Sequence, residues 1–187
     1  GLGFSNVPFE FYEAFEVKTG GYSAEYGRST GGVINAVTKS GTNEFEFGLD
    51  VNASFDSLRT DSPDTKLRNG DIYTYNGADS RDDVNISLSA AGPIIKDKLF
   101  FYAMYNPRDI EAVGVSGQGS TYAVSKADDA FWGAKLDWYI NDNHRLEYTA
   151  FSDQNDSVTD NYAYDIATYT QGAYGSTATD SSGGDNY

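Results

Sequence analysis

Residues 43–56 hold a two-residue alternation for longer than an ordinary strand. The apolar side chains occupy the odd positions and most polar ones the even positions: Phe45, Phe47, Leu49, Val51, Ala53 and Phe55 against Glu44, Glu46, Asp50, Asn52, Ser54 and Asp56. Alternate side chains of a strand point to opposite faces, and strands in soluble proteins are usually about 5–6 residues long. The pattern predicts a long strand with one face on lipid and the other on a wet lumen.

Further runs of the same kind follow along the chain. We predict strands over 82–95, 99–106, 128–140 and 145–153, and earlier strands over 12–18 and 33–38. In the run 82–95 the apolar face is Val84, Ile86, Leu88, Ala90 and Ile94, and in 128–140 it is Ala130, Trp132, Ala134, Leu136, Trp138 and Ile140. A small hairpin is expected near 72–75. These runs predict an all-β chain.

The connections between the long runs are expected to alternate in length. Residues 57–81, 108–126 and those from 155 onward are polar and predict long loops, whereas 96–98 and 141–143 predict short turns. Outer-membrane barrels have short periplasmic turns and long external loops, and aromatic side chains gather at membrane interfaces, as they do here beside both short turns. A soluble β-sandwich is the alternative, but its long and short loops would not be separated onto opposite ends of the strands.

Five strands cannot close a barrel, and an open sheet edge is untenable in lipid. The prediction is therefore a transmembrane antiparallel β-barrel of which this chain supplies a part. The chain opens at Gly1 without a signal-peptide pattern and ends in a low-complexity tail, 172–187. Both ends are accordingly expected to interrupt a longer polypeptide.

Composition removes several classes of function. The 187 residues contain no cysteine, so a disulfide or a thiolate metal site is excluded. The formal net charge of -15 argues against a nucleic-acid partner. His144 is the single histidine, which excludes a histidine-based triad and a multi-histidine zinc site within this chain. No catalytic constellation, metal site or cofactor motif is found, and we expect a protein that is not an enzyme.

A glycine-rich stretch, 20–42, precedes the first long strand. It reads GGYSAEYGRSTGGVINAVTKSGT, with a β-branched run at 33–38 between its glycines. Glycines permit positive-φ turns and close backbone approach, and the β-branched run favours a strand. We predict a glycine-punctuated loop that feeds a buried strand and exits through 40–42.

This stretch resembles the end of the plug domain of TonB-dependent outer-membrane receptors, and above all their Oar-like branch. The resemblance is carried by YSAEYGR at 22–28, GGVIN at 31–35 and TKSG at 38–41. GPIIKDKLFF at 92–101 independently resembles a hairpin of the same branch, and 13–20 resembles a plug strand. The junction motif between plug and barrel would comprise Tyr26, Gly27, Arg28, Gly31, Gly32, Val33, Ile34, Asn35, Thr38, Lys39 and Gly41.

The resemblance implies a domain division and a function. Residues 1–42 would be the C-terminal part of the plug, and 43–187 the first five or so strands of a 22-stranded barrel. The protein would import a scarce solute, such as a siderophore, an oligosaccharide or a peptide, across the outer membrane of a Gram-negative bacterium. TonB would supply the energy through an upstream region absent from this chain, and membrane lipid and lipopolysaccharide would surround the wall.

Two other functions are compatible with the residues. One is a passive porin or surface adhesin with the same wall, and the other is a soluble β-sandwich that binds polysaccharide. Nothing in the sequence identifies the residues that bind the solute.

Several polar and aromatic groups remain open to more than one interpretation. Acidic clusters at 79–83, 128–129 and 153–160 could hold calcium or be solvated loop residues. Ion pairs between plug and wall could involve Arg28, Lys39, Glu44 and Glu46. The loop tyrosines could grip a ligand or pack on one another: Tyr73, Tyr75, Tyr122, Tyr162, Tyr164, Tyr169 and Tyr174.

Overall fold

The computed structural model describes residues 7–19, 32–116, 120–127 and 130–186. Within these residues the regular structure consists of β-strands and two single 3₁₀ turns, η1 (Phe9–Phe11) and η3 (Asp56–Leu58). The all-β, antiparallel prediction is therefore confirmed. The part of the chain that the structure describes contains no helix long and apolar enough to cross a membrane.

The strands form two small hairpins and one large sheet. The first hairpin pairs β1 (Tyr12–Lys18) with β2 (Val33–Thr38), and the second pairs β4 (Thr65–Lys66) with β5 (Ile72–Thr74). The nine-stranded antiparallel sheet contains β3 (Glu46–Ser54), β6 (Ser80–Ile95), β7 (Leu99–Ser116), β8 (Thr121–Ala127), β9 (Ala130–Asn141), β10 (His144–Ser152), β11 (Asn155–Asp165), β12 (Thr170–Ser182) and β13 (Asp185–Asn186).

Several of these strands are collinear halves of longer ones. β7 pairs with β9 over Leu99–Pro107 and with β8 over Ile110–Ser116 in one continuous register. β10 and β11 then pair with β9 and β8 in the same way, and β13 and β12 pair with β10 and β11. The sheet is thus an up-and-down meander in which each long strand neighbours the next one along the chain.

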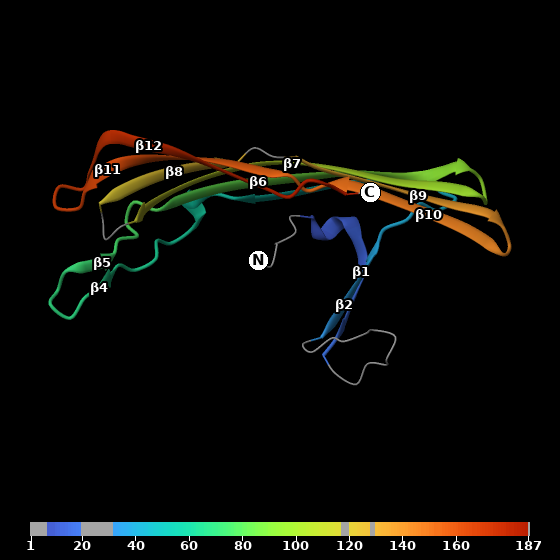
Figure 1. Cartoon of the computed structure of the whole chain (residues 1–187), viewed down its shortest axis with the longest axis horizontal. Helices are drawn as coiled ribbons and strands as arrows, with labels where there is room; N and C mark the ends of the chain where they lie inside the picture. Colours follow the sequence, from blue (N-terminus) through green and yellow to red (C-terminus); the bar gives the residue numbers. More distant parts are fainter. Residues whose placement is uncertain (1–6, 20–31, 117–119, 128–129, 187) are drawn as a thin grey trace.

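The sheet is long and thin, and both hairpins lie on one side of it (Figure 1). The two short turns, 96–98 and 142–143, lie together at one end. The connection between β3 and β6, which carries β4 and β5, lies at the opposite end. The β1–β2 hairpin projects from the same side of the sheet, and residues 39–45, which we call the joining segment, lead from it into β3.

The structure confirms the expected strands. The short strands occur at 12–18 and 33–38 as predicted, and the alternating run at 43–56 contains β3. The expectation that the strand at 33–38 is buried is wrong, since it lies in a two-stranded hairpin with Ile34 71% exposed. The hairpin expected near 72–75 is the β4–β5 pair. A helical turn is also favoured by Ser23 and Glu25, but those residues lie outside the described ones.

Two polar regions predicted as loops are strands instead. The loop expected over 108–126 is the continuation of β7, a turn and β8, and the loop and tail expected from 155 onward contain β11 and β12. Polar composition indicates contact with water, but the backbone groups of a polar segment can be satisfied by pairing in a hairpin as well as by water. Because β7 extends to Ser116 and β8 begins at Thr121, the predicted alternation of long and short loops fails there.

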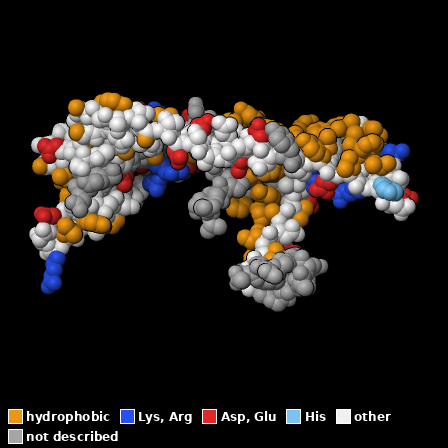
Figure 2. Space-filling view, viewed as in Figure 1, with side chains coloured by type: hydrophobic (Ala, Val, Ile, Leu, Met, Phe, Trp, Pro, Cys, Tyr) orange, Lys and Arg blue, Asp and Glu red, His pale blue; other side chains and the backbone are white. Residues whose placement is uncertain are grey.

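Exposure on the sheet is reversed relative to a soluble protein. Phe47 and Leu49 on β3 are 81% and 65% exposed, whereas Lys135 and Asp137 on β9 are 2% and 1% exposed. Figure 2 shows hydrophobic side chains on the upper surface over the ends of β9 and β10, with charged ones beneath them. Burial alternates along β9 as predicted, with Lys135 and Asp137 buried and Leu136 exposed between them. β3 is exposed on both faces, but its apolar residues lie opposite the apolar residues of β6, so the apolar sets predicted for these two strands share one face of the sheet: Phe47 opposite Ala90, Leu49 opposite Leu88 and Val51 opposite Ile86.

Candidate functional site at the base of the hairpin

Phe11 anchors the start of the hairpin to the sheet. Its side chain is 0% exposed and contacts the rings of Phe131 at 5.3 Å, Tyr102 at 5.9 Å and Phe151 at 6.1 Å between centroids. The ring occupies the space above Gly133, where a Cβ atom would lie 2.5 Å from Phe11 Cε2. The absence of a side chain at position 133 therefore creates the hole that Phe11 fills.

The base of the hairpin is closed by hydrogen bonds and lies close to the sheet. The Lys39 N–H donates to the Phe11 carbonyl oxygen at 3.0 Å, and the Tyr102 hydroxyl donates to the Glu10 carbonyl oxygen at 3.2 Å. Burial, and secondarily the Asp153 carboxylate, raise the pKa of Tyr12 above its ordinary value. These contacts fix where the hairpin meets the sheet.

Gly41 brings the joining segment into direct contact with the sheet backbone. A Cβ atom at this position would lie 2.2 Å from the Phe101 carbonyl oxygen and 2.9 Å from that of Gly92. Gly92 and Phe101 are themselves partners across β6 and β7. Since backbone cannot move aside as a flexible side chain can, glycine is required at position 41 for this approach.

Asn43 ties the joining segment to the short turn between β6 and β7. Its Nδ2 donates to Asp97 Oδ1 at 2.7 Å, and the Asp97 N–H donates to Asn43 Oδ1 at 2.9 Å. Asp97 has a φ of 63°, a left-handed conformation that aspartate adopts more readily than most residues. The reciprocal pair therefore links the segment to the end of the sheet that carries the short turns.

A network of four charged side chains lies on β9 and β10 beside this segment. Lys135 Nζ lies 2.8 Å from Glu147 Oε1, and Arg145 Nη2 lies 2.5 Å from Asp137 Oδ1 and 2.9 Å from Glu147 Oε2. Lys135 Nζ also donates to the Thr38 carbonyl oxygen at 3.3 Å. The network thus joins the nine-stranded sheet to the last residue of β2.

Asp137 is the most enclosed member of this network. Arg145 satisfies its Oδ1 atom, while its buried Oδ2 atom has no hydrogen-bond partner among the described residues. The Arg145 guanidinium also lies 5.2 Å from the centre of the Tyr139 ring, within the range of a cation–π contact. Arg145 is therefore the group that compensates a buried negative charge.

The structure describes only part of the predicted junction motif. Tyr26, Gly27, Arg28 and Gly31 lie outside the described residues. Gly32 has a φ of 150°, and a Cβ there would lie 3.1 Å from the Lys18 carbonyl oxygen. Val33, Ile34 and Asn35 pair with Lys18, Val17 and Glu16 in the hairpin. Thr38, Lys39 and Gly41 belong to the contacts described above.

The possible ion pairs between plug and wall do not form among the described residues. Among the described residues, Lys39, Glu44 and Glu46 take part in no ion pair, and Arg28 lies outside them. Sequence reasoning missed Phe11, Asn43, Asp97 and the network of four. That network could have been found, because opposite charges alternate along two runs joined by a predicted short turn.

Six of the seven loop tyrosines form a continuous chain of ring contacts. Tyr75 contacts Tyr164 at 6.0 Å and Tyr169 at 5.3 Å, and Tyr122 links Tyr164 at 6.0 Å to Tyr162 at 6.4 Å, from which Tyr174 continues at 5.7 Å. Burial, followed by the Tyr164 hydroxyl, raises the pKa of Tyr75. The rings therefore pack on one another, as one of the two interpretations predicted.

The remaining polar candidates supply no assembled site. His144 is exposed and its Nδ1 lies 2.8 Å from Asn141 Oδ1 in the turn at 142–143, as expected for a solvated turn residue. Within the described residues, no group of three or more histidine or acidic side chains is placed to hold a metal ion.

The fold and the reversed exposure define a section of an antiparallel membrane-barrel wall. The chain is 33% identical over 159 residues to the TonB-dependent transporter Oar of Myxococcus xanthus, covering 79% of this chain and 15% of that protein. It is 34% identical over 123 residues to the probable TonB-dependent siderophore receptor PirA of Acinetobacter baumannii, covering 63% of this chain and 14% of that protein. No family model and no solved structure matches.

The chain therefore belongs to the TonB-dependent receptors, which are outer-membrane proteins of Gram-negative bacteria, and within them it resembles Oar. It spans about 15% of the length of the relatives that it matches. These relatives are named as a transporter and a receptor, not as enzymes.

Proposed function

We propose that this chain is the plug-to-barrel junction of a receptor that imports a scarce solute across the outer membrane with energy from TonB. Residues 1–42 are then the end of the plug, and residues 43–187 begin a barrel wall of 22 strands. TonB acts through an upstream region, and lipid with lipopolysaccharide surrounds the apolar face. The solute classes that suit the family are siderophores, oligosaccharides and peptides.

The reversed exposure of the sheet is the observation that supports this proposal most. Burying a side chain such as Phe or Leu is worth about 1.5–3 kcal/mol in a water-soluble protein. Exposing Phe47, Leu49 and Val51 along one strand while enclosing Lys135 and Asp137 is therefore unfavourable in water. It is favourable where hydrocarbon covers the outer face and a polar lumen lies on the other.

The two edges of the sheet support a larger wall. In the described residues, β3 pairs only with β6, and β12 pairs only with β11. Unpaired backbone groups cannot remain open within lipid, because no water is present to bond them. Further strands of the intact protein would pair with both edges.

The contacts of the joining segment suit a plug that stays tethered when it is pulled. Asn43 and Gly41 hold the segment to β6 and β7, beyond the point where the hairpin ends. Among the described residues, the hairpin itself is held to the sheet through Phe11, Thr38 and their neighbours. A force on the plug would then break the hairpin contacts while the tether at 41–43 remains seated.

The test is uptake by cells that carry the intact receptor. Accumulation of a transported solute should fall to background when TonB is deleted or when a protonophore removes the proton gradient. Flux that continues unchanged under both treatments would identify a passive porin instead. Extraction of the protein into buffer without detergent would contradict the membrane location and support the soluble sandwich.

A further inference from the structure

We propose that a hollow at the end of the sheet opposite the short turns binds a small zwitterionic solute, such as a short peptide with free termini. This inference rests on the proposed function, because it names the solute class that the receptor would admit. The hollow has a volume of about 230 Å³ and lies where the connection between β3 and β6 covers the ends of β6 and β7.

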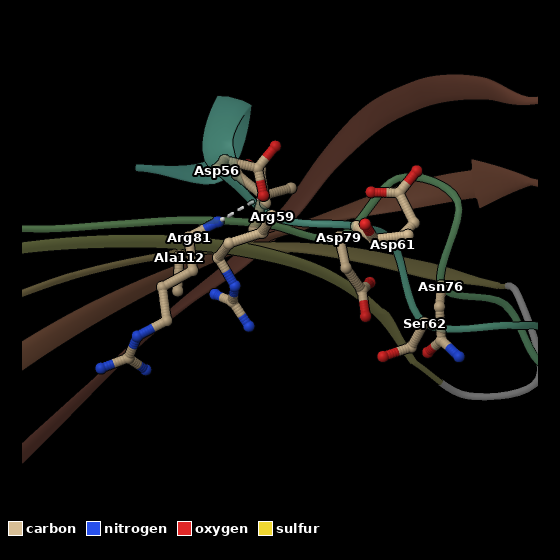
Figure 3. A pocket seen from close by; sticks show the side chains of 11 residues that line it. Asp56, Arg59, Asp61, Ser62, Asn76, Asp79, Arg81 and Ala112 are labelled. Carbon is tan, nitrogen blue, oxygen red and sulfur yellow. Dashed lines mark hydrogen bonds between the residues drawn. The ribbon is translucent and has the colours of Figure 1, made fainter. Parts of the chain in front are cut away.

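The two arginines of this hollow lie at one end, apart from Asp61 and Asp79 at the other. Figure 3 shows the guanidinium groups of Arg59 and Arg81 on one side and the polar ends of Asp79, Ser62 and Asn76 on the other. All of these groups point away from the strands in the same direction. The hollow therefore offers cationic donors at one end, where Asp56 also lies, and the carboxylates of Asp61 and Asp79 with neutral polar groups at the other.

Hydrogen bonds within the connection hold the Arg81 end in place. The Asp56 N–H donates to Asp82 Oδ1 at 2.8 Å, and the Arg81 N–H donates to Asp56 Oδ1 at 3.3 Å. This pair fixes the 3₁₀ turn that precedes Arg59 to the first residues of β6. The guanidinium groups are accordingly presented from an ordered backbone.

The opposite end is fixed in a similar way. The Asn76 N–H donates to Asp64 Oδ1 at 2.8 Å, and Asn76 Nδ2 donates to the Pro63 carbonyl oxygen at 2.9 Å. Asp79 Oδ1 accepts the Val115 N–H at 3.2 Å, which positions the carboxylate at the end of β7. The second oxygen of Asp79 takes no part in that bond.

The two arginines differ in whether the guanidinium group already forms an ion pair. Arg81 Nη2 lies 3.1 Å from Asp83 Oδ2, whereas the side chain of Arg59 makes no hydrogen bond or ion pair within the described part of the chain. Arg59 is therefore the stronger candidate to bind the solute. Its planar guanidinium can hold a carboxylate through two parallel hydrogen bonds.

A molecule with a carboxylate and an ammonium group matches both ends. The carboxylate would meet Arg59, and the ammonium would meet Asp79 with Asn76 and Ser62 beside it. The volume is below the roughly 300–1,000 Å³ of pockets for drug-sized ligands, which suits an amino acid or a dipeptide. Among the described residues that line the hollow none is aromatic, so these residues offer no stacking surface of the kind that sugars and aromatic chelators favour.

The experiment is calorimetric titration of the intact receptor in detergent at neutral pH. The probes are glycylglycine, its N-acetylated form and glycylglycinamide, which lacks the free carboxylate. We expect glycylglycine to bind at least about tenfold more tightly than either capped form, because each cap removes one charge-assisted contact.

Two variants test which residue binds each charged end of the peptide, and a third variant is the control. Arg59→Gln should weaken glycylglycine about tenfold and leave glycylglycinamide unchanged, whereas Asp79→Asn should weaken glycylglycine and leave the N-acetylated form unchanged. The asparagine can still accept the Val115 N–H. Arg68→Gln changes an exposed arginine that does not line the hollow and should have no effect.

Equal binding of the three probes, or no binding of glycylglycine, would overturn the inference. If uptake of another solute still required TonB, the proposed function would stand without this site. If glycylglycine bound as expected but its uptake were independent of TonB, the site would stand and the transport proposal would fail.

Discussion

Replacing Phe11 by alanine is expected to release the β1–β2 hairpin from the sheet at a cost of about 3–5 kcal/mol. The Phe11 ring is fully enclosed by Tyr102, Phe131 and Phe151 and fills the space above Gly133. Alanine would leave a cavity there that the backbone of three paired strands cannot collapse to fill.

Hydrogen exchange in the intact receptor measures this release. Amides of β1 and β2 should exchange about a hundredfold to four-thousandfold faster in Phe11→Ala, because about 1.4 kcal/mol corresponds to a factor of ten in local opening. Phe9→Ala is the matched control, since Phe9 is 79% exposed and only two residues away. Equal exchange in the two variants would mean that Phe11 does not anchor the hairpin.

Replacing Arg145 by methionine is expected to destabilise the wall by about 3–5 kcal/mol. The change leaves the enclosed Asp137 carboxylate without the cation 2.5 Å from its Oδ1 atom, and its Oδ2 atom already lacks a partner among the described residues. An uncompensated buried charge costs far more than the ion pair contributes. Urea unfolding of the intact receptor in detergent micelles measures the loss.

A second substitution separates charge from packing. Asp137→Asn combined with Arg145→Met should recover most of the stability, because the orphaned charge is then gone. Lys126→Met is the control: it breaks the exposed pair between Lys126 and Glu111, 3.0 Å apart, and should cost at most about 1 kcal/mol. A loss in Arg145→Met no larger than this control would show that water screens Asp137.

The two-residue alternation of apolar and polar side chains predicted most of the strands. The alternation in residues 43–56 and 128–140 predicted which side chains face outward, because a period of two leaves only two choices of face. The alternation failed to predict strands in residues 108–126 and 155–182, where polar side chains occupy both faces. There the strands are held by backbone pairing, which side-chain hydrophobicity does not report.

The candidate site was only partly accessible from sequence. Gly41 stood out as a glycine at the exit from a strand, but its function depends on Gly92 and Phe101, which are distant along the chain. Phe11 looked like one aromatic among several in a loop. Its importance comes from the hole above Gly133, and a hole between strands has no signature in a single sequence.

The central claim is that alternate side chains of β3 face hydrocarbon and lumen. This chain contains no cysteine, so single cysteines can be introduced and spin-labelled. The outward set is Phe47, Leu49 and Val51, and the inward set is Glu46, Asp50 and Asn52. In the intact receptor reconstituted in bilayers, the outward labels should collide mainly with dissolved oxygen and the inward labels mainly with a water-soluble nickel chelate. Labels of both sets that respond mainly to the nickel chelate would contradict the account.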